Sequence, residues 1–378
     1  MPMTLKVMTI VGTRPEVIKL SRVIAELDRR VAHVLVHTGQ NHDYELNQIF
    51  FDELRIRKPD HFLGCAGRSA VATMANVLNR SDAVMSKERP DAVLLLGDTN
   101  SCLAAISAKR RRIPVFHMEA GNRSFDDRVP EEINRRIVDH VSDINLPYTE
   151  HARRYLLREG LRPETVIKTG SPMYEVLRFH QRQIARSTVL RRLKLTPRGY
   201  FAVSAHREEN VDHAGNFRDL LATLDAVARR YGKPVVVSTH PRTRARLDAL
   251  KGGRRSAAIR FVKPLGFPDY IRLQSGALCT LSDSGTLTEE SSILGFPAVM
   301  LRQAHERPEG MDEAAVIMAG LKPERVLEAV DLAIAQDRGR RRPARMVADY
   351  EAANVSEKVV RIIVSYTDYV NRTVWRAG

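Results

Sequence analysis

Five carboxylates crowd into one short stretch of a basic chain. The stretch HMEAGNRSFDDRVPEEINRR spans residues 117–136 of a 378-residue protein whose formal net charge is +15. Its acids are Glu119, Asp126, Asp127, Glu131 and Glu132. Carboxylates can exchange protons with a substrate, or they can carry solvated surface charge. Acid–base chemistry therefore has to be weighed against a charged surface for this stretch.

Other polar residues follow directly after apolar runs of the chain. In an open parallel sheet the ligand crevice lies beyond the carboxyl ends of the strands, so these residues are the first candidates for a site. They are Gly12-Thr13-Arg14-Pro15-Glu16, Gly97-Asp98-Thr99, Glu119-Ala120-Gly121, His206-Arg207 and Asp283-Ser284-Gly285.

The first of these sets predicts a helix start. Thr13 and Glu16 have the spacing of a capping box, and Pro15 is tolerated in a first helical turn. Arg14 lies inside that cap and Lys19 about one turn further along, where a helix N-terminus attracts anions. Both could bind a phosphate or an acidic group, and the alternative for each is an ordinary surface cation.

The segment SDSGTLTEESSILG (282–295) predicts a second helix start, with Gly295 at the helix end. Ser284, Gly285 and Thr286 offer backbone N–H groups and hydroxyls that could cradle a diphosphate, and Glu290 could bind two ribose hydroxyls. Plain capping of the helix is the alternative. The chain has neither GxGxxG nor GxxxxGK[ST], so a nicotinamide site or P-loop has no support.

Two aromatic residues and one histidine complete the candidates. Phe267 and Tyr270 precede the strand that leads to the cradle, where an aromatic ring could stack on a nucleobase or belong to the core. His206 stands at a strand end and could act in a site or only cap the next element. The histidines lack the spacing of a metal site, so no metal is expected.

The elements that must position these residues alternate along the chain. Apolar strand-like runs are each followed by a helical pattern, which predicts parallel sheets covered on both faces. The runs are LKVMTIVG, HVLVHTG, DAVLLLG, PVFHMEA, DINLPYT, YFAVSAH, KPVVVSTH, ALCTLSD and PAVMLR. A charged, helix-permissive segment at 171–198 separates two α/β domains, 1–180 and 181–354. A last helix within 355–378 could pack on either domain, the N-terminal one included.

Composition excludes several classes of protein. The three cysteines lie far apart, which favours neither a disulfide framework nor a thiolate zinc site and points to the cytoplasm. No uncharged apolar run is long enough to span a membrane. Basic residues are scattered and aromatic residues make up 6% of the chain, so nucleic acid is not an expected partner despite the positive charge.

Ten motifs, in order, resemble those of the non-hydrolysing UDP-N-acetylglucosamine 2-epimerase family. The resemblance runs from about residue 5 to residue 322. The motifs are GTRPEVIKL, TGQNHDYEL, GDTNS, HMEAGNR, VPEEINR, KTGSP, SAHREEN, PLGFPDY, DSGTLTEESSILGFP and HERPEG. The resemblance implies an α/β fold of the GT-B type: two Rossmann-like doubly wound domains with the active site between them. It also implies a homodimer, a UDP-sugar substrate, and neither a metal nor another cofactor.

The resemblance also implies roles for residues at the motif positions. Asp98, Glu119 and Glu131 match the family's catalytic carboxylates, and His206 matches its active-site histidine. The cationic contacts and the UDP site are matched by Arg14, Lys19, Arg135, Tyr270, Ser284, Gly285, Thr286 and Glu290. Asp126, Asp127 and Glu132 match no role, and surface charge is the expected explanation for them.

Departures from the family pattern bear on the sugar. The chain has DSGTLTEE where DSGGIQEE is usual, and TGQNHD where TGQHRE is usual, which puts a second, activating UDP-sugar site in doubt. AGNRSFDDRVPEE, SAHREENVD, STHPRTR and HERPEGMDEAAV resemble a branch that forms UDP-N-acetyl-L-fucosamine from UDP-2-acetamido-2,6-dideoxy-L-talose for capsule or O-antigen. This branch is the first expectation, and a UDP-N-acetylglucosamine 2-epimerase is the alternative. A GT-B glycosyltransferase and a hydrolysing epimerase are more remote.

Overall fold

The computed structural model describes residues 3–40, 51–249, 256–304, 306–337 and 344–376. The end of the TGQNHD motif, residues 41–43, therefore lies outside the described residues. The chain divides into two compact units, Met1–Phe179 with Asp349–Gly378, and His180–Ala348. We call them the first unit and the second unit.

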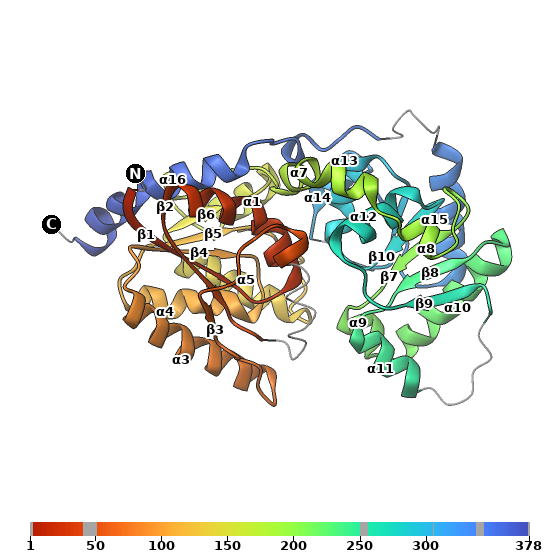
Figure 1. The fold of residues 1–378 in the computed structure, drawn as a ribbon, viewed down its shortest axis with the longest axis horizontal. Coiled ribbons are helices and arrows are strands. Elements are labelled where there is room, and N and C mark those ends of the chain that lie inside the picture. Colours follow the sequence, from red (N-terminus) through yellow and green to blue (C-terminus); the bar gives the residue numbers. More distant parts are fainter. Residues whose placement is uncertain (1–2, 41–50, 250–255, 305, 338–343, 377–378) are drawn as a thin grey trace. The chain divides into compact units, whose positions relative to one another are not determined.

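The first unit is built on a parallel sheet of six strands in the order β3-β2-β1-β4-β5-β6 (Figure 1). The strands are β1 (Met3–Val11), β2 (Val31–His37), β3 (His61–Phe62), β4 (Ala92–Leu96), β5 (Val115–Met118) and β6 (Ile144–Leu146). The chain winds outward from β1 to one edge and then from β4 to the other. The order therefore reverses between β1 and β4, which is where doubly wound sheets bind ligands.

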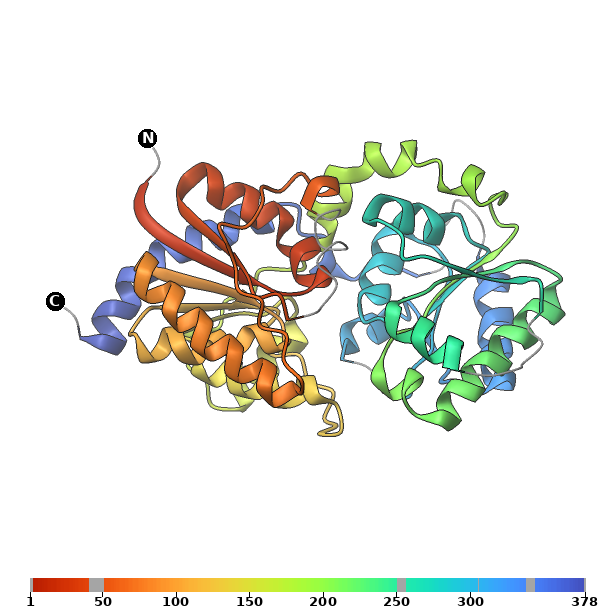
Figure 2. The same cartoon turned by 60° about the horizontal axis from the view of Figure 1, so that its bottom comes forward.

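Helices cover both faces of this sheet. α1 (Arg14–Arg30) and α16 (Val355–Val370) pack together on one face, and α16 confirms the helix predicted at 355–370. α3 (Ala70–Glu88), α4 (Ala104–Arg110) and α5 (Pro130–Val141) bury apolar side chains against the other face. Figure 2 shows from a second direction that α1, in red, and α3, in orange, lie on opposite sides of the sheet. The remaining helical segments are η1 (Asn100–Leu103), α6 (Glu150–Arg158), η2 (Pro163–Thr165), η3 (Ala348–Tyr350) and η4 (Asn371–Trp375).

The second unit repeats the same sheet. Its six parallel strands lie in the order β12-β11-β10-β7-β8-β9, so the reversal falls between β7 and β10. The strands are β7 (Phe201–Ser204), β8 (Val235–Ser238), β9 (Ile259–Val262), β10 (Cys279–Ser282), β11 (Ala298–Met300) and β12 (Ile317–Met318). α7 (Met173–Arg186) carries the chain from the first unit into the second.

Side chains of the central strands alternate between two apolar cores. Phe201 and Val203 of β7 belong to the core beneath α10 (Ala214–Tyr231) and α15 (Pro323–Gln336). Ala202, between them, belongs to the core beneath α8 (Val189–Arg192) and α12 (Phe267–Gly276). This alternation is the period of two that a strand imposes, and it explains why the run is apolar throughout. The other helices are α9 (Glu208–Val211), α11 (Pro241–Ala249), α13 (Thr286–Leu294) and α14 (Pro308–Asp312).

No helix of the described residues is long and apolar enough to cross a membrane.

Candidate active site

The loop after β1 makes a close approach to neighbouring loops. A Cβ atom at Gly12 would overlap the hydroxyl groups of Thr38 and Ser101, which are hydrogen-bonded to each other, so the loop needs a glycine here. The predicted capping box is confirmed, because the Thr13 N–H donates to Glu16 Oε2 at 2.6 Å. Arg14 is the first residue of α1 and is half-buried.

Glu16 ties this loop to the loop after β4. Its carboxylate accepts hydrogen bonds from the Gly12 N–H and from the hydroxyl of Thr99, both at 2.6 Å. Burial raises the pKa of Glu16 to about 7, although the hydrogen bonds from Thr99, Gly12 and Thr13 oppose the rise. A buried carboxyl group thus fixes the two loops on either side of the strand-order reversal.

Lys19 and Glu119 form an ion pair beyond the ends of the strands. The Lys19 Nζ atom lies 2.6 Å from Glu119 Oε2, and the two side chains are only 5% and 11% exposed. Glu119 directly follows β5 and has φ of 62°, in the left-handed region that a residue with a side chain rarely adopts. Such strained backbone is typical of functional sites, where the surrounding structure holds it in place.

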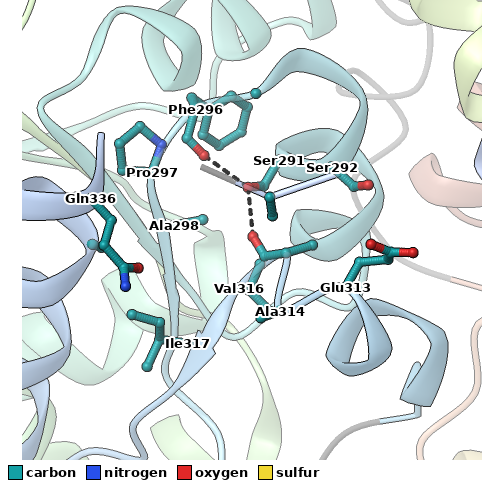
Figure 3. Close-up of a pocket in the computed structure, with 14 residues that line it drawn as sticks. Ser291, Ser292, Phe296, Pro297, Ala298, Glu313, Ala314, Val316, Ile317 and Gln336 are labelled. Carbon is teal, nitrogen blue, oxygen red and sulfur yellow. Dashed lines mark hydrogen bonds between the residues drawn. The ribbon is translucent and has the colours of Figure 1, made fainter. Parts of the chain in front are cut away.

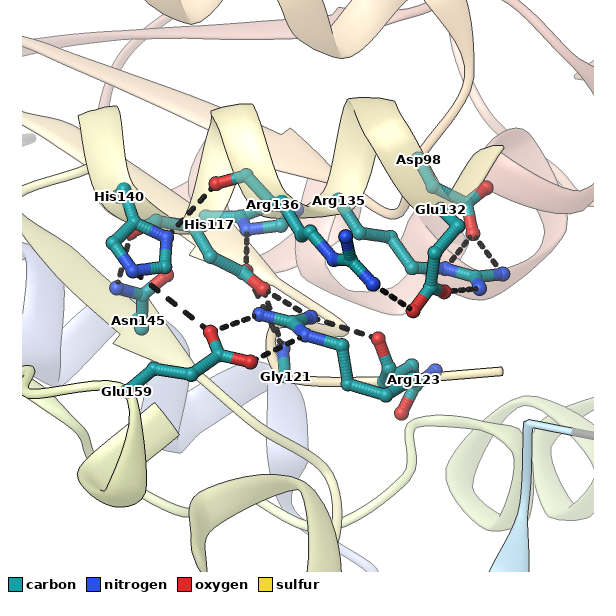
Figure 4. Close-up of polar contacts among 12 residues, drawn as sticks. Asp98, His117, Gly121, Arg123, Glu132, Arg135, Arg136, His140, Asn145 and Glu159 are labelled. Carbon is teal, nitrogen blue, oxygen red and sulfur yellow. Dashed lines mark hydrogen bonds and ion pairs between the residues drawn. The ribbon is translucent and has the colours of Figure 1, made fainter. Parts of the chain in front are cut away.

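Asp98 and Arg135 form a second pair. The Arg135 guanidinium donates to Asp98 Oδ2 from Nε at 2.7 Å, and its Nη1 donates to Glu132 Oε2 at 2.8 Å. Asn134, beside Arg135 on α5, donates to the Asp98 backbone carbonyl at 2.9 Å. Helix α5 therefore holds Asp98 by both its side chain and its backbone (Figure 4).

Glu132 is not the surface charge that the sequence suggested. Its side chain is fully buried, and it accepts hydrogen bonds from the backbone N–H groups of Ser124 and Phe125 as well as from Arg135. The expectation of surface charge was therefore wrong for Glu132, since the loop after β5 needs an acceptor there. Asp126 pairs with Arg128 near solvent, and Asp127 is 69% exposed.

Helix α5 buries charged side chains and exposes two isoleucines, although its Val138 packs in the core. Glu132, Arg135 and Asp139 are buried, whereas Ile133 and Ile137 are exposed. Glu131 lies in the first turn of this helix and is half-buried. The first unit thus brings Lys19 to Glu119 and Arg135 to Asp98, while Arg14 and Glu131 stand at the starts of α1 and α5.

In the second unit, Asp283 organises the loop after β7. This fully buried carboxylate accepts hydrogen bonds from the backbone N–H groups of His206 and Arg207, each at 3.0 Å, and from the Asn210 side chain. The His206 Nδ1 atom lies 3.3 Å from Asp283 Oδ1, and the ring is 38% exposed. The ring of His240 lies 5.6 Å from the ring of His206, a neighbour that the sequence analysis did not single out.

The predicted cradle forms the N-terminus of α13, and Gly295 ends that helix with φ of 72°, as predicted. The hydroxyl groups of Ser284 and Thr286 lie 2.9 Å apart, and Gly285 is the residue that caps the helix. The backbone N–H groups and the positive end of a helix suit an anion here. Glu290 is buried within α13.

Arg307 donates a hydrogen bond to the backbone of the cradle. Its Nε donates to the Gly285 carbonyl at 3.1 Å, and its Nη2 lies 3.1 Å from the buried Glu289 carboxylate. Arg307 belongs to the HERPEG motif, but no role was predicted for it from the sequence. Tyr270 lies half-buried on α12, and Phe267 is part of the core, the alternative considered for it.

The described residues form no metal cluster, and a cavity of the second unit lies apart from the predicted site residues. Among the described residues, no group of three His, Cys, Asp or Glu side chains could hold a metal ion. A cavity of about 480 Å³ lies against α13, β11 and α15 (Figure 3). Glu313 is the charged residue in its lining, and none of the predicted site residues lines it. We assign no function to this cavity.

Most of the chain matches a known family. The family model described as UDP-N-acetylglucosamine 2-epimerase matches residues 25–364. A UDP-N-acetylglucosamine 2-epimerase structure from Rickettsia bellii is 53% identical, with a TM-score of 0.93, and the match covers 99% of this chain and 100% of that one. The UDP-GlcNAc 2-epimerase of Methanocaldococcus jannaschii, solved in complex with UDP-GlcNAc and UDP, is 32% identical with a TM-score of 0.87, covering 96% of this chain and 100% of that one.

A further relative is named for another sugar. The UDP-2,3-diacetamido-2,3-dideoxy-D-glucuronate 2-epimerase of Pseudomonas aeruginosa is 32% identical over 331 residues, which are 86% of this chain and 91% of the relative.

Fold and similarity together define an α/β enzyme with two Rossmann-like domains of the GT-B type, and this predicted fold class is confirmed. The chain belongs to the UDP-N-acetylglucosamine 2-epimerase family and is an isomerase.

Proposed function

We propose that the protein interconverts UDP-N-acetylglucosamine and UDP-N-acetylmannosamine by inverting C2 of the sugar without hydrolysing it. The names of its relatives support this substrate over the fucosamine precursor that the motifs put first. The observation that carries the proposal is the pair of buried ion pairs in the first unit, Lys19 with Glu119 and Arg135 with Asp98.

The chemistry requires more than one carboxylate. The C2–H of the pyranose is not acidic, because no carbonyl group is conjugated to it. When the C1–O bond breaks, its electron pair leaves with UDP, and C2–H becomes removable by a nearby carboxylate. The products are a 2-acetamidoglycal and UDP. Return of UDP to C1, with a proton delivered to the opposite face of C2, completes the inversion.

The first unit supplies the groups for proton transfer. Asp98, Glu119 and Glu131 are the carboxylates that remove a proton from one face of C2 and return one to the other. The Lys19 and Arg135 ion pairs hold two of these carboxylates in defined positions. Arg14, at the start of α1, stabilises the departing diphosphate.

The second unit supplies the groups for UDP. Ser284, Gly285 and Thr286 bind the diphosphate at the N-terminus of α13, where the helix end favours an anion. Glu290 binds the ribose hydroxyls and Tyr270 stacks on the uracil ring. His206, oriented by Asp283, contacts the diphosphate as it leaves.

Proton NMR in D2O tests this function directly. The purified protein is incubated with UDP-N-acetylglucosamine, and the C2 position and the anomeric signals are followed with time. We expect deuterium at C2 and a new anomeric signal, with the UDP linkage retained. Free sugar accumulating in place of the epimer would instead indicate a hydrolysing epimerase. No exchange would contradict the proposal and favour a GT-B glycosyltransferase.

A second sugar is tested in the same experiment. The stretches AGNRSFDDRVPEE and HERPEGMDEAAV resemble enzymes that form UDP-N-acetyl-L-fucosamine, and the Pseudomonas aeruginosa relative is named for a sugar other than N-acetylglucosamine. UDP-2-acetamido-2,6-dideoxy-L-talose is therefore incubated in parallel. Faster exchange on this substrate would assign the enzyme to the fucosamine branch and to surface-polysaccharide synthesis.

We also propose a cytoplasmic homodimer. All three cysteines are buried and unpaired, which suits a reducing compartment. Sedimentation of the purified protein is expected to give twice the mass of the 42.6 kDa chain, and a monomer would contradict the dimer.

A further inference from the structure

His117 is a buried histidine that the proposed chemistry does not use. It lies on β5, two residues before Glu119, and its side chain is 1% exposed. The ring Nδ1 atom lies 2.9 Å from Asp139 Oδ1, and the Nε2 atom lies 2.7 Å from the Gly97 carbonyl oxygen. Both ring nitrogens are therefore in hydrogen bonds, one to α5 and one to the loop after β4.

The partners of His117 determine its protonation. A carbonyl oxygen only accepts, so Nε2 must carry a hydrogen. Asp139 also accepts from the Gly121 N–H at 3.1 Å and from Arg123 Nη1 at 2.7 Å, as an ionised carboxylate does. The Nδ1 atom that faces this carboxylate must then carry a hydrogen too. His117 is therefore an imidazolium that donates on both sides.

The charges around His117 agree with this geometry. Burial alone would lower the pKa of His117, but the bond to Asp139, the Gly97 carbonyl and the charge of Asp98 outweigh it and raise the pKa. Burial likewise opposes ionisation of Asp139, yet His117 and Arg123 lower the pKa of Asp139. Arg123 is paired in turn with Glu159 at 2.6 Å (Figure 4).

The two ring hydrogen bonds of His117, which we call its two arms, connect it to the backbone turns that carry two of the predicted catalytic carboxylates. One bond reaches its turn directly and the other reaches it through Asp139. Gly97, whose carbonyl accepts from Nε2, has φ of 77° and precedes Asp98. Gly121, whose N–H donates to Asp139, has φ of 80° and follows Glu119 by two residues. Both turns have left-handed backbone at a glycine, a residue with many accessible conformations, so contacts to the rest of the unit are needed to hold each turn in one of them.

We propose that His117 is a positioning residue for C2 epimerisation. As a doubly donating imidazolium, it fixes the Asp98 turn through Gly97 and the Glu119 turn through Asp139, so that both carboxylates keep their places relative to C2. This inference rests on the proposed function. It adds a group that does not touch the sugar but sets where the proton-transfer groups stand.

Two variants separate the two arms. His117→Gln places an amide near Nε2 that can donate to Gly97 but not to Asp139, and His117→Asn places one near Nδ1 with the opposite result. We expect both to lower kcat for C2 deuteration by about 100-fold, the effect of a small misplacement of catalytic groups, with KM and UDP affinity within several-fold of wild type. His140→Gln, an exposed histidine of α5, is the control and is expected to keep the wild-type kcat.

Nitrogen NMR of the wild-type protein measures the protonation of the two His117 ring nitrogens directly. With ¹⁵N-labelled histidine, and the signal assigned by its absence from His117→Gln, both ring nitrogens are expected to be protonated at pH 7. As the pH rises, C2 deuteration is expected to fall in step with loss of one of these protons. A neutral ring at pH 7, activity that persists after deprotonation, or variants with wild-type kcat would each overturn the proposal.

The same measurements keep the two proposals apart. The wild-type protein alone tests the proposed function. If it deuterates neither sugar, the proposed function fails and the positioning role fails with it. If wild type is active and the folded variants are too, the positioning role alone fails. If both variants unfold, the pH titration of the wild-type protein still tests the positioning role. Activity that persists after the His117 ring loses a proton contradicts that role.

Discussion

The two sheets share one strand order and differ in what they place at the point where it reverses. In the first unit, charged side chains pair with each other beyond the strand ends, as Lys19 of α1 does with Glu119 after β5. In the second unit, the carboxylate of Asp283 accepts backbone N–H groups, and the loop after β10 presents hydroxyls and a helix N-terminus. In the proposed function, one scaffold would thus provide proton-transfer groups in one unit and an anion cradle in the other.

The buried carboxylates of the two units differ in the donors from which they accept hydrogen bonds. Glu119 accepts from the Lys19 ammonium group and from the Asn122 side chain, both of them side-chain donors. Asp283 accepts from the backbone N–H groups of His206 and Arg207 and from the Asn210 side chain, so it holds the loop after β7 in place. Variants that exchange or remove these features should therefore affect turnover in one unit and affinity in the other.

The largest effect is expected for the carboxylates of the first unit. Glu119→Gln or Glu131→Gln should lower C2 deuteration by about 10²- to 10⁴-fold, since each removes a proton-transfer group. UDP affinity, measured by calorimetry, should stay within several-fold of wild type because the cradle belongs to the second unit. Asp127→Asn, in the same acidic stretch but 69% exposed, should behave like wild type. Equal loss of turnover and UDP affinity would mean misfolding or a wrong assignment.

Removal of a buried carboxylate that only supports the site should cost stability. Glu132→Ala leaves Arg135 and two loop N–H groups without their buried acceptor, which is expected to lower the unfolding free energy by about 3–5 kcal/mol. Asp127→Ala removes an exposed charge and should cost less than about 1 kcal/mol. Urea unfolding of both variants measures the contrast, and similar values would show that burial of Glu132 is not what stabilises the loop.

Glu16 should make stability depend on pH. Because its pKa in the folded protein, about 7, is above the ordinary 4.5, the folded state holds this proton more tightly than the unfolded state. The unfolding free energy should therefore fall by about 3 kcal/mol as the pH rises from 4.5 to 7. Glu16→Gln cannot ionise and should flatten that part of the curve. Urea unfolding at several pH values tests this, and a Glu16→Gln curve with the wild-type slope would contradict it.

A smaller effect is expected in the second unit. Ser284→Ala removes one hydroxyl of the cradle, and a hydrogen bond to a charged group contributes about 1.5–3 kcal/mol, so the Kd for UDP should rise about tenfold or more. Ser275→Ala, whose hydroxyl bonds to the Ile271 carbonyl within α12, should leave the Kd unchanged. An unchanged Kd in Ser284→Ala would show that the cradle is misplaced.

Most of the sheet could be predicted from the sequence. Each of the nine apolar runs contains a strand, because strands buried on both faces must be apolar throughout. Three strands were missed, β3 (HF), β9 (IRFV) and β12 (IM). All three lie at sheet edges, where two to four residues suffice and a charge such as Arg260 is tolerated, so no apolar run marks them.

The site could be predicted only in part. The position of Asp98 and Glu119 after strands is a consequence of the sheet, and the sequence shows it. Which charged side chains are buried could not be predicted in this way. Neighbours such as Glu131 and Glu132 are the same residue type, yet on a helix they point about 100° apart. Only the fold reveals that Glu132 faces Arg135, and that His117 faces Asp139.

The exposed isoleucines and buried charges of α5 have a consequence for how this helix is aligned. A surface helix ordinarily takes its rotation about its own axis from an apolar stripe that faces the core, whereas α5 buries Val138 but exposes Ile133 and Ile137. Its rotation is therefore also set by directional ion pairs to residues outside the helix, Asp139 with Arg123 and Arg135 with Asp98, and salt screens such pairs little where they are buried. A rotation of α5 by one residue would turn Arg135 away from Asp98, so these ion pairs allow the helix only one orientation.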